Sequence, residues 1–289
     1  MTYKLDLEQI TILLSRMAEA LERIAPSYKF PDNLEKAEGF IWEAQLRKLQ
    51  TIEEIERLPL SCLQGIEPQK RELLENSRAF ARGLKANNAL LWGARGTGKS
   101  SLLKAVHGQL LSEGLDCAIV EVQREDIQDL PHIMQVLKHS NRRFILFCDD
   151  LAFEEADSSY KSLKAVLEGG LSGRPDNIVF YATSNRRHLM PRQMIDNERG
   201  SAINPSEAIE EKISLSDRFG LWIGFHSVDQ DTYLSMIESY VGFYELPVDL
   251  EQTKSQALSW CMGRGHRSGR TAYQFIIHLA GTLGITLKK

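Results

Sequence analysis

Eight consecutive residues carry the strongest chemical signal in this sequence. Residues 93–100 read GARGTGKS and fit the phosphate-binding pattern G-x-x-x-x-G-K-[ST] at every required position. Glycines in such a loop let successive backbone N–H groups approach phosphate oxygens closely. Lys99 can then reach the β- and γ-phosphates, and the Ser100 hydroxyl can bind Mg²⁺. This pattern predicts a nucleoside triphosphate site; the alternative is a glycine-rich turn with an exposed lysine.

The residues before and after this loop have the patterns of the strand and the helix that a phosphate-binding loop connects. Residues 88–92 are typical of a short buried strand, and residues 101–106 are typical of the start of a helix. A strand, a glycine-rich loop and a helix N-terminus together form an anion-binding site. The residues that we assign to the nucleotide in this segment are Gly93, Ala94, Arg95, Gly96, Thr97, Gly98, Lys99, Ser100 and Ser101.

Two acids follow a second apolar run, RFILFCDD at residues 143–150. A carboxylate at the C-terminal end of a buried strand, beside a phosphate loop, can bind Mg²⁺ directly or through water. We assign this role to Asp149, and we assign to Asp150 the orientation of the attacking water. The alternative is structural, because strand-to-loop junctions often carry Asp.

A third apolar run, NIVFYATSN at residues 177–185, ends in Asn185. A neutral amide between the γ-phosphate and the water can report whether the terminal phosphate is present. A plain turn at Asn185 is the equally weighted alternative.

The wider pattern alternates helices with short apolar strands. Strands are expected at 89–92, 117–122, 144–148, 178–182 and 221–226, with helices at 67–84, 99–112, 131–138 and 158–167. Such an alternation indicates an α/β fold with a parallel sheet. Only helical patterns follow, at 229–243, 249–262 and 268–282. We therefore expect three parts: a helical N-terminal extension (1–58), an αβα nucleotide-binding domain (59–226) and an α-helical lid (227–289).

The N-terminal part combines a helical pattern with an aromatic cluster. Apolar residues recur there at helical spacing, namely Ile10, Leu13, Leu14, Met17, Leu21 and Ile24, before Pro26. An aromatic cluster follows, made of Tyr28, Phe30, Phe40 and Trp42. We expect this segment to lie as a strap across the next domain.

Composition excludes several classes of function. The formal charge is −4, from 35 basic and 39 acidic residues, so direct nucleic-acid binding is not indicated. The four cysteines form no C-x-x-C pair, which argues against a zinc site or a disulfide framework. No apolar run approaches the length of a membrane span, and no signal peptide is apparent. A cytoplasmic location is the resulting expectation.

Taken together, these segments resemble an AAA+ ATPase over residues 60–289. The runs LWGARGTGKS (91–100), FCDDL (147–151) and EKISLSDRFG (211–220) are similar to an uncharacterised bacterial family of predicted AAA+ ATPases, catalogued as a domain of unknown function. The resemblance implies a five-stranded parallel sheet of order 5-1-4-3-2 with a C-terminal helical lid.

The resemblance also implies roles for individual residues. Asn185 matches the first sensor, and Arg218 matches an arginine finger that a neighbouring subunit inserts toward the γ-phosphate. The alternative for Arg218 is a helix-end cation or a salt bridge to Asp217. Arg186 and Arg187 are the substitutes for the finger.

Two further segments are assigned in the same way. Arg270, in the first turn of the last helix, matches a second sensor from the lid, with Arg267 as runner-up and a solvated basic loop as the alternative. Gly65 and Ile66 resemble the segment that packs on adenine; their alternative is a helix N-terminal turn with Pro68 near its start.

The expected function is hydrolysis of Mg·ATP by a homo-oligomer that remodels or loads an unidentified macromolecular partner. Many AAA+ enzymes have Asp-Glu where this chain has Asp149-Asp150, so a slowly hydrolysing ATP-dependent switch or adaptor is the first alternative. A small-molecule kinase is the second. The polar stretch 188–212 is either a mobile effector loop or an ordinary surface insertion.

Overall fold

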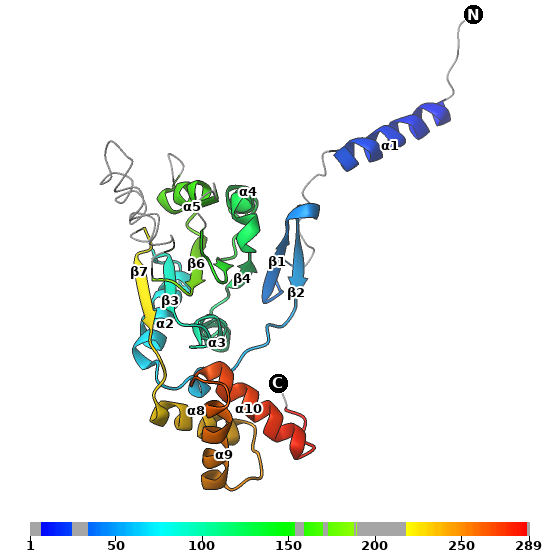
Figure 1. The fold of residues 1–289 in the computed structure, drawn as a ribbon. Coiled ribbons are helices and arrows are strands. Elements are labelled where there is room, and N and C mark those ends of the chain that lie inside the picture. Colours follow the sequence, from blue (N-terminus) through cyan, green and yellow to red (C-terminus); the bar gives the residue numbers. More distant parts are fainter. Residues whose placement is uncertain are drawn as a thin grey trace, which may run out of the picture.

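The computed structural model describes residues 7–24, 34–153, 159–169, 173–187, 189 and 218–287. Tyr28, Phe30 and nearly all of the predicted loop 188–212 lie outside these ranges. The strands are β1 (Gly39–Glu43), β2 (Lys48–Ile52), β3 (Ala89–Gly93), β4 (Ala118–Glu121), β5 (Phe144–Cys148), β6 (Ile178–Ser184) and β7 (Leu221–Phe225). The helices are α1 (Leu7–Ile24), α2 (Glu67–Ala81), α3 (Lys99–Ser112), α4 (Leu130–Leu137), α5 (Ser159–Glu168), α8 (Gln230–Phe243), α9 (Leu250–Met262) and α10 (Gly269–Thr282) (Figure 1).

The strands form one seven-stranded sheet of order β2-β1-β4-β5-β6-β3-β7. The expected count of five strands is therefore wrong. The five strands that the sequence predicts lie side by side in the order β7-β3-β6-β5-β4, and every pairing among them is parallel. The phosphate-loop strand β3 is thus flanked by β6, which leads to Asn185, and by β7, which follows Arg218.

The two additional strands correct the expectation for the N-terminal segment. Residues 39–52 contain two strands in place of the expected α-helix: β1 pairs antiparallel with β2 and parallel with β4, and so extends the sheet. Phe40 and Trp42 are buried on the α/β unit, and the Trp42 Nε1 donates to Asp129 Oδ2 at 3.0 Å. These strands are short and are joined by a 3₁₀ turn, Ala44–Leu46, rather than by a glycine or asparagine turn. Pairing with β4, a contact distant in sequence, stabilises them.

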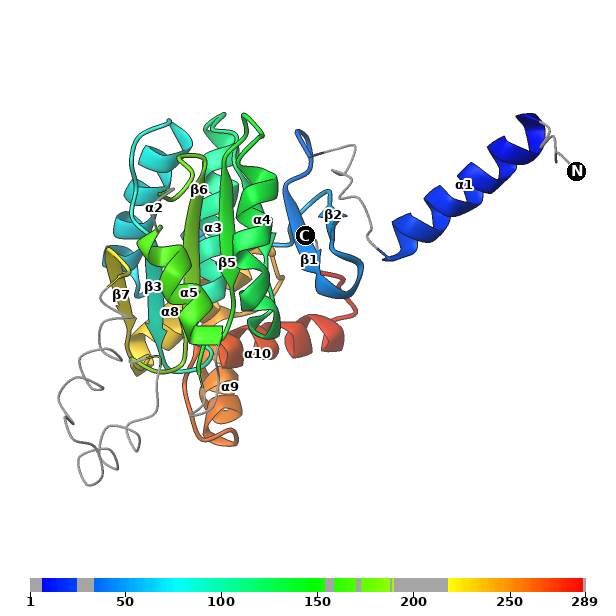
Figure 2. The ribbon, with the colours of Figure 1, turned by 90° about the horizontal axis from the view of Figure 1, so that it is seen from above.

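Helices cover both faces of the sheet (Figure 2). On β3, Leu90 belongs to a buried cluster with residues of α4 and α5, whereas its neighbour Leu91 belongs to a cluster with residues of α2 and α3. Successive side chains of a strand point to opposite faces, so strands covered on both faces need continuous apolar runs. The cysteines are free and buried, and burial raises the pKa values of the Cys117 and Cys148 thiols to about 12.

A third buried cluster joins α8, α9 and α10 into a small helical domain at the C-terminal end of the described chain. Each of these helices begins at a capping side chain: Asp229, Asp249 and Ser268 accept hydrogen bonds from the backbone N–H three residues later. None of the helices in the described ranges is long and apolar enough to cross a membrane. The cytoplasmic location stays a prediction.

Candidate nucleotide-binding site

The phosphate loop connects the end of β3 to the start of α3, as the motif requires. Its glycines adopt positive φ, +142° at Gly93, +77° at Gly96 and +95° at Gly98, a region that residues with a Cβ rarely occupy. A Cβ at Gly93 would lie only 2.2 Å from the carbonyl oxygen of Phe225 on β7. The glycines are therefore needed for the shape of the loop and for its close approach to β7.

The Lys99 side chain lies folded under this loop. Its Nζ donates to the carbonyl oxygens of Gly93 and Ala94, both at 2.8 Å, and to Asn185 Oδ1 at 3.2 Å. Lys99 is buried, and burial lowers the pKa of the amine, partly offset by the nearby carboxylates of Asp149 and Asp150. The ammonium group is thus held beside the loop and linked to the end of β6.

Asp149 lies beside the first residues of α3, where it accepts hydrogen bonds from two hydroxyl groups. Ser100 Oγ donates to Asp149 Oδ1 at 2.6 Å, and Thr183 Oγ1 donates to the same oxygen. Hydroxyl and carboxylate oxygens suit Mg²⁺, which binds through one or two carboxylate or hydroxyl ligands together with water and substrate phosphates. The described residues contain no group of three or more His, Cys, Asp or Glu side chains that could hold a metal ion by themselves. Ser100 and Asp149 are compatible with a magnesium ion that a nucleotide also binds.

The neighbouring acid, Asp150, has a different environment. Its backbone is left-handed, with φ +52°, and its N–H donates to Thr183 Oγ1 at 2.9 Å. Asn185 Nδ2 donates to its Oδ1, and Arg95 Nη2 lies 3.3 Å from its Oδ2. The Asp150 side chain is half exposed (52%), so a water molecule can reach it once these two contacts change.

The helical domain contacts the phosphate loop directly through the start of α10. The Arg270 N–H donates to the Gly96 carbonyl at 3.2 Å, and the Arg270 side chain lines the same cavity as Lys99. Arg270 lies in the first turn of α10, as expected, with Ser268 as the N-cap. The runner-up, Arg267, lies 3.4 Å from Gln230 Oε1 and does not line the cavity.

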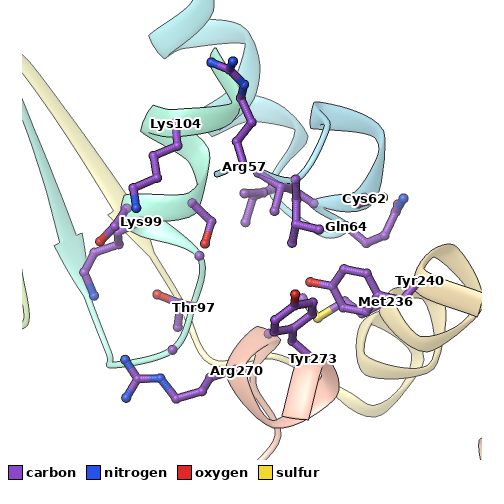
Figure 3. A pocket seen from close by; sticks show the side chains of 18 of the residues that line it. Arg57, Cys62, Gln64, Thr97, Lys99, Lys104, Met236, Tyr240, Arg270 and Tyr273 are labelled. Atoms are coloured by element: carbon purple, nitrogen blue, oxygen red, sulfur yellow. The ribbon is translucent and has the colours of Figure 1, made fainter. Parts of the chain in front are cut away.

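The cavity between the sheet domain and the helical domain measures about 670 Å³. This volume falls in the range of small-molecule sites, about 300–1,000 Å³. Figure 3 shows Thr97 and Arg270 at one end, and Tyr240, Tyr273 and Met236 reaching in from the helical domain. The rings of Tyr240 and Tyr273 meet edge to face, with centroids 5.7 Å apart.

Sequence reasoning missed these lid aromatics. Tyr240 on α8 and Tyr273 on α10 look like ordinary helix residues, and only the packing of the two helices brings them to one cavity wall. Of the two residues assigned to adenine, Ile66 lines the cavity and Gly65 does not. Gly65 has φ +76°, and a Cβ there would lie 2.3 Å from Thr232 Cγ2 on α8. Ile66 is the N-cap of α2, and Pro68 lies in the first turn of that helix. The alternative that we gave for this segment, a helix N-terminal turn, therefore describes its backbone correctly.

The arginine assigned as a finger does not face its own subunit's cavity. Arg218 Nε donates to Glu168 Oε1, at the end of α5, at 2.8 Å. This partner differs from Asp217, the partner considered from the sequence, which lies outside the described residues. Of the two substitutes, Arg187 lies over the Trp92 ring, 5.2 Å from its centroid, and Arg186 donates its N–H to Ser184 Oγ at 3.2 Å.

A partly buried chain of polar side chains joins the N-terminal segment to the helix that starts at the phosphate loop. Arg57, which also lines the cavity, donates to both carboxylate oxygens of Glu38 and lies 3.2 Å from His107 Nδ1. His107 Nε2 lies 2.8 Å from the Cys117 carbonyl. Because a carbonyl only accepts and a guanidinium only donates, His107 is neutral with its proton on Nε2. Burial lowers its pKa to about 4.

The sheet order around β3, the phosphate loop after it and the helical domain over the loop define the fold class of the AAA+ ATPases. A structure of the Aeropyrum pernix ORC2 protein shares this fold at a TM-score of 0.54, with 12% identity over 81% of this chain and 68% of that chain. The Thermotoga maritima RuvB Holliday junction branch migration motor aligns at a TM-score of 0.44, with 13% identity over 76% of this chain and 72% of that chain.

The sequence comparison gives the family. Residues 35–283 match the family described as "Protein of unknown function (DUF815)", and the chain belongs to it. The resemblance noted from the three motifs is therefore confirmed. A search of curated proteins finds no significant match.

Proposed function

We propose that this protein binds Mg·ATP in the cavity between its two domains and hydrolyses it. The observation that carries the proposal is the convergence of Lys99, the Ser100–Asp149 pair and Arg270 on one glycine-rich loop. These groups come from the loop, from β5 and from the helical domain. Together they supply two cations and an oxygen pair for a triphosphate, while the tyrosines and Ile66 supply an apolar wall for a base.

Each group has a role in the proposed reaction. Lys99 would exchange its carbonyl partners for the β- and γ-phosphate oxygens. Ser100 and Asp149 would hold Mg²⁺, which neutralises charge on the phosphates. Asp150 would orient a water molecule whose oxygen attacks the γ-phosphorus while the bond to the bridging oxygen of ADP breaks. The proton of the water would pass to Asp150, and the products would be ADP and phosphate.

The contacts of Asp150 support slow turnover as the second candidate. Its carboxylate is shorter than the glutamate common at this position, and both of its oxygens contact Asn185 or Arg95. The contacts from Asn185 and Arg95 compete with a hydrogen bond from the attacking water, so hydrolysis is slowed unless Asp150 exchanges one of these partners for water. An ATP-dependent switch or adaptor is therefore the alternative that a specific contact favours.

We propose further that the active form is a homo-oligomer, which acts on an unidentified macromolecular partner. Arg218 is bound to Glu168 outside its own cavity, so any role at a γ-phosphate requires a neighbouring subunit. An arginine supplied in this way stabilises the charge of the transition state and can contribute about 10³–10⁵ in rate. A head-to-tail contact of this type produces a ring or a filament.

Substitution of Lys99 tests the nucleotide site. Lys99→Met keeps the length of the side chain and removes its charge. A hydrogen bond to a charged group contributes about 1.5–3 kcal/mol, so ATP affinity measured by calorimetry should fall about 10- to 150-fold. Lys254→Met is the matched control, because Lys254 pairs with Glu238 and Glu251 on the helical domain, away from the cavity. Equal affinities for wild type and Lys99→Met would refute the assignment of this site.

Mixing two inactive variants tests the subunit contact. Arg218→Ala should bind ATP nearly normally and hydrolyse it slowly, and Lys99→Ala should not bind it well. Mixed assemblies contain interfaces that pair an intact loop with an intact Arg218, so turnover should partly recover. If mixing restores nothing and turnover per subunit does not depend on concentration, Arg218 does not act between subunits.

A further inference from the structure

The side chain of Arg95 extends from the phosphate loop to Asp150, and the proposed reaction leaves it without a role. Arg95 Nη2 donates to Asp150 Oδ2 at 3.3 Å, and both residues line the cavity between the two domains. The Arg95 side chain is 74% exposed and that of Asp150 is 52% exposed. An ion pair so open to solvent is weak, because water screens its charges and two mobile side chains must be held in one geometry. A stronger anion in the cavity can therefore displace Asp150 from Arg95.

The partners of Asp150 indicate which phosphate Arg95 would meet. Lys99 Nζ donates to Asn185 Oδ1 at 3.2 Å, and Asn185 Nδ2 donates to Asp150 Oδ1. The two loop cations, Lys99 and Arg95, are thus joined through an amide and a carboxylate. Asp150 is the residue proposed to orient the water that attacks the γ-phosphorus, so the groups beside it face the γ-phosphate. Because Arg95 is one of those groups, its guanidinium lies nearer to the γ-phosphate than to the other two.

The charges around the phosphate loop favour an additional anion. Lys99, Arg95 and Arg270 are cations that line this part of the cavity, and Asp149 and Asp150 are the carboxylates beside them. Burial lowers the pKa of Lys99, the two carboxylates raise it, and the guanidinium groups of Arg270 and Arg95 lower it again. The three cations therefore repel one another, and an anion bound among them relieves that repulsion. A planar guanidinium can also contact two oxygens of one phosphate group, which a lysine ammonium cannot match in geometry.

We propose that Arg95 distinguishes ATP from ADP: its guanidinium leaves Asp150 to bind the γ-phosphate of ATP, and it returns to Asp150 when the nucleotide is ADP. This inference rests on the proposed function, because it requires a nucleotide in the cavity. The exchange breaks and forms hydrogen bonds only. It frees one carboxylate oxygen of Asp150 for the attacking water when a triphosphate is present, and it keeps that oxygen occupied otherwise. Arg95 thus regulates Asp150 according to the nucleotide that is bound.

Calorimetry with two nucleotides separates this role from a general role in the loop. The full chain is titrated with Mg·ADP and with the magnesium complex of adenylyl imidodiphosphate, a triphosphate analogue that resists hydrolysis. Arg95→Gln removes the charge and should weaken binding of the analogue about tenfold or more, while ADP affinity stays within about twofold of wild type. Arg95→Lys keeps the charge and should recover part of the loss. Arg78→Gln is the matched control, because Arg78 also pairs with a carboxylate, that of Glu113, and does not line the cavity; it should change neither affinity.

The outcomes keep this inference distinct from the proposed function. If wild type binds both nucleotides and Arg95→Gln keeps the ratio of their affinities, the nucleotide site stands and the role of Arg95 is refuted. An equal loss for ADP and the analogue would assign Arg95 to the shape of the loop and refute its role as well. A wild type that binds neither nucleotide would overturn the proposed function and this inference together. Since the Arg95 side chain is exposed, all variants should keep the far-UV circular dichroism of wild type.

Nuclear magnetic resonance follows the exchange of partners itself. The Nε–H signal of Arg95, identified by its absence from Arg95→Lys, should move when the analogue is added and much less when ADP is added. In Asp150→Asn without nucleotide, the same signal should already differ from wild type, because the charged partner is gone. A signal that does not respond to Asp150→Asn, or that moves equally with both nucleotides, would show that Arg95 does not alternate between Asp150 and the γ-phosphate.

Discussion

Gly96 is the point at which the helical domain meets the phosphate loop, and its replacement by alanine tests that contact. Gly96 has φ +77°, and a Cβ there would lie 3.1 Å from both Arg270 Cβ and Ser268 Oγ. The Gly96 carbonyl also accepts the hydrogen bond from the Arg270 N–H. Gly114, after α3, provides a matched control with φ +70° and nothing within 4 Å of the added Cβ.

The magnitudes follow from these two environments. A left-handed backbone costs an alanine about 1–2 kcal/mol, and this term is common to both variants. At Gly96 the helical domain must also move by a few tenths of an ångström, which weakens a hydrogen bond that contributes about 1 kcal/mol. We therefore expect Gly114→Ala to lower the unfolding free energy by about 1–2 kcal/mol and Gly96→Ala by about 2–3 kcal/mol.

Denaturant unfolding and ATP calorimetry on both variants complete the test. Gly96→Ala should also weaken ATP binding by about tenfold or more, because in the proposed site the loop and Arg270 would contact the same nucleotide, whereas Gly114→Ala should not. Equal stability losses together with unchanged ATP affinity in both variants would refute the view that the contact between Gly96 and Arg270 shapes the site.

Two further outcomes are expected. Asp149→Asn should weaken binding of Mg·ATP, whereas Asp150→Asn should bind it normally and hydrolyse it slowly in a single-turnover assay; equal binding losses would reject the division of roles. The buried, neutral His107 should make the protein sensitive to acid, because burial lowers its pKa to about 4 in the folded state. Between pH 6.5 and pH 4 the histidine therefore binds a proton in the unfolded chain but not in the folded one. The unfolding free energy should fall by up to about 3 kcal/mol as the pH drops through this window. Chemical unfolding at several pH values measures this loss, and His107→Gln should show a flatter dependence; parallel curves for the two proteins would assign the acid sensitivity to other groups.

The local elements could be predicted because each has its own pattern. GARGTGKS requires glycines for its backbone shape, and the structure places them at positive φ between β3 and α3. The apolar runs before Asp149 and Asn185 are strands buried on both faces. A continuous apolar run identifies such a strand from the local sequence, without knowledge of the strands beside it. The capping residues Asp229, Asp249 and Ser268 mark the starts of the helices in the C-terminal helical domain for the same local reason.

Other features depend on contacts between residues that are distant in the sequence. The strands β1 and β2 are stabilised by the pairing of β1 with β4, about eighty residues later in the chain. The sequence of residues 39–52 does not reveal this contact, so its local pattern was too weak to predict two strands. Tyr240 and Tyr273 become neighbours only when α8 packs on α10, and Arg57 reaches His107 only across the interior. The sequence alone determined which residues could bind a phosphate, since that chemistry lies in one short loop. Only the tertiary structure decided which side chains surround that loop, because packing, and not local pattern, sets the distances between them.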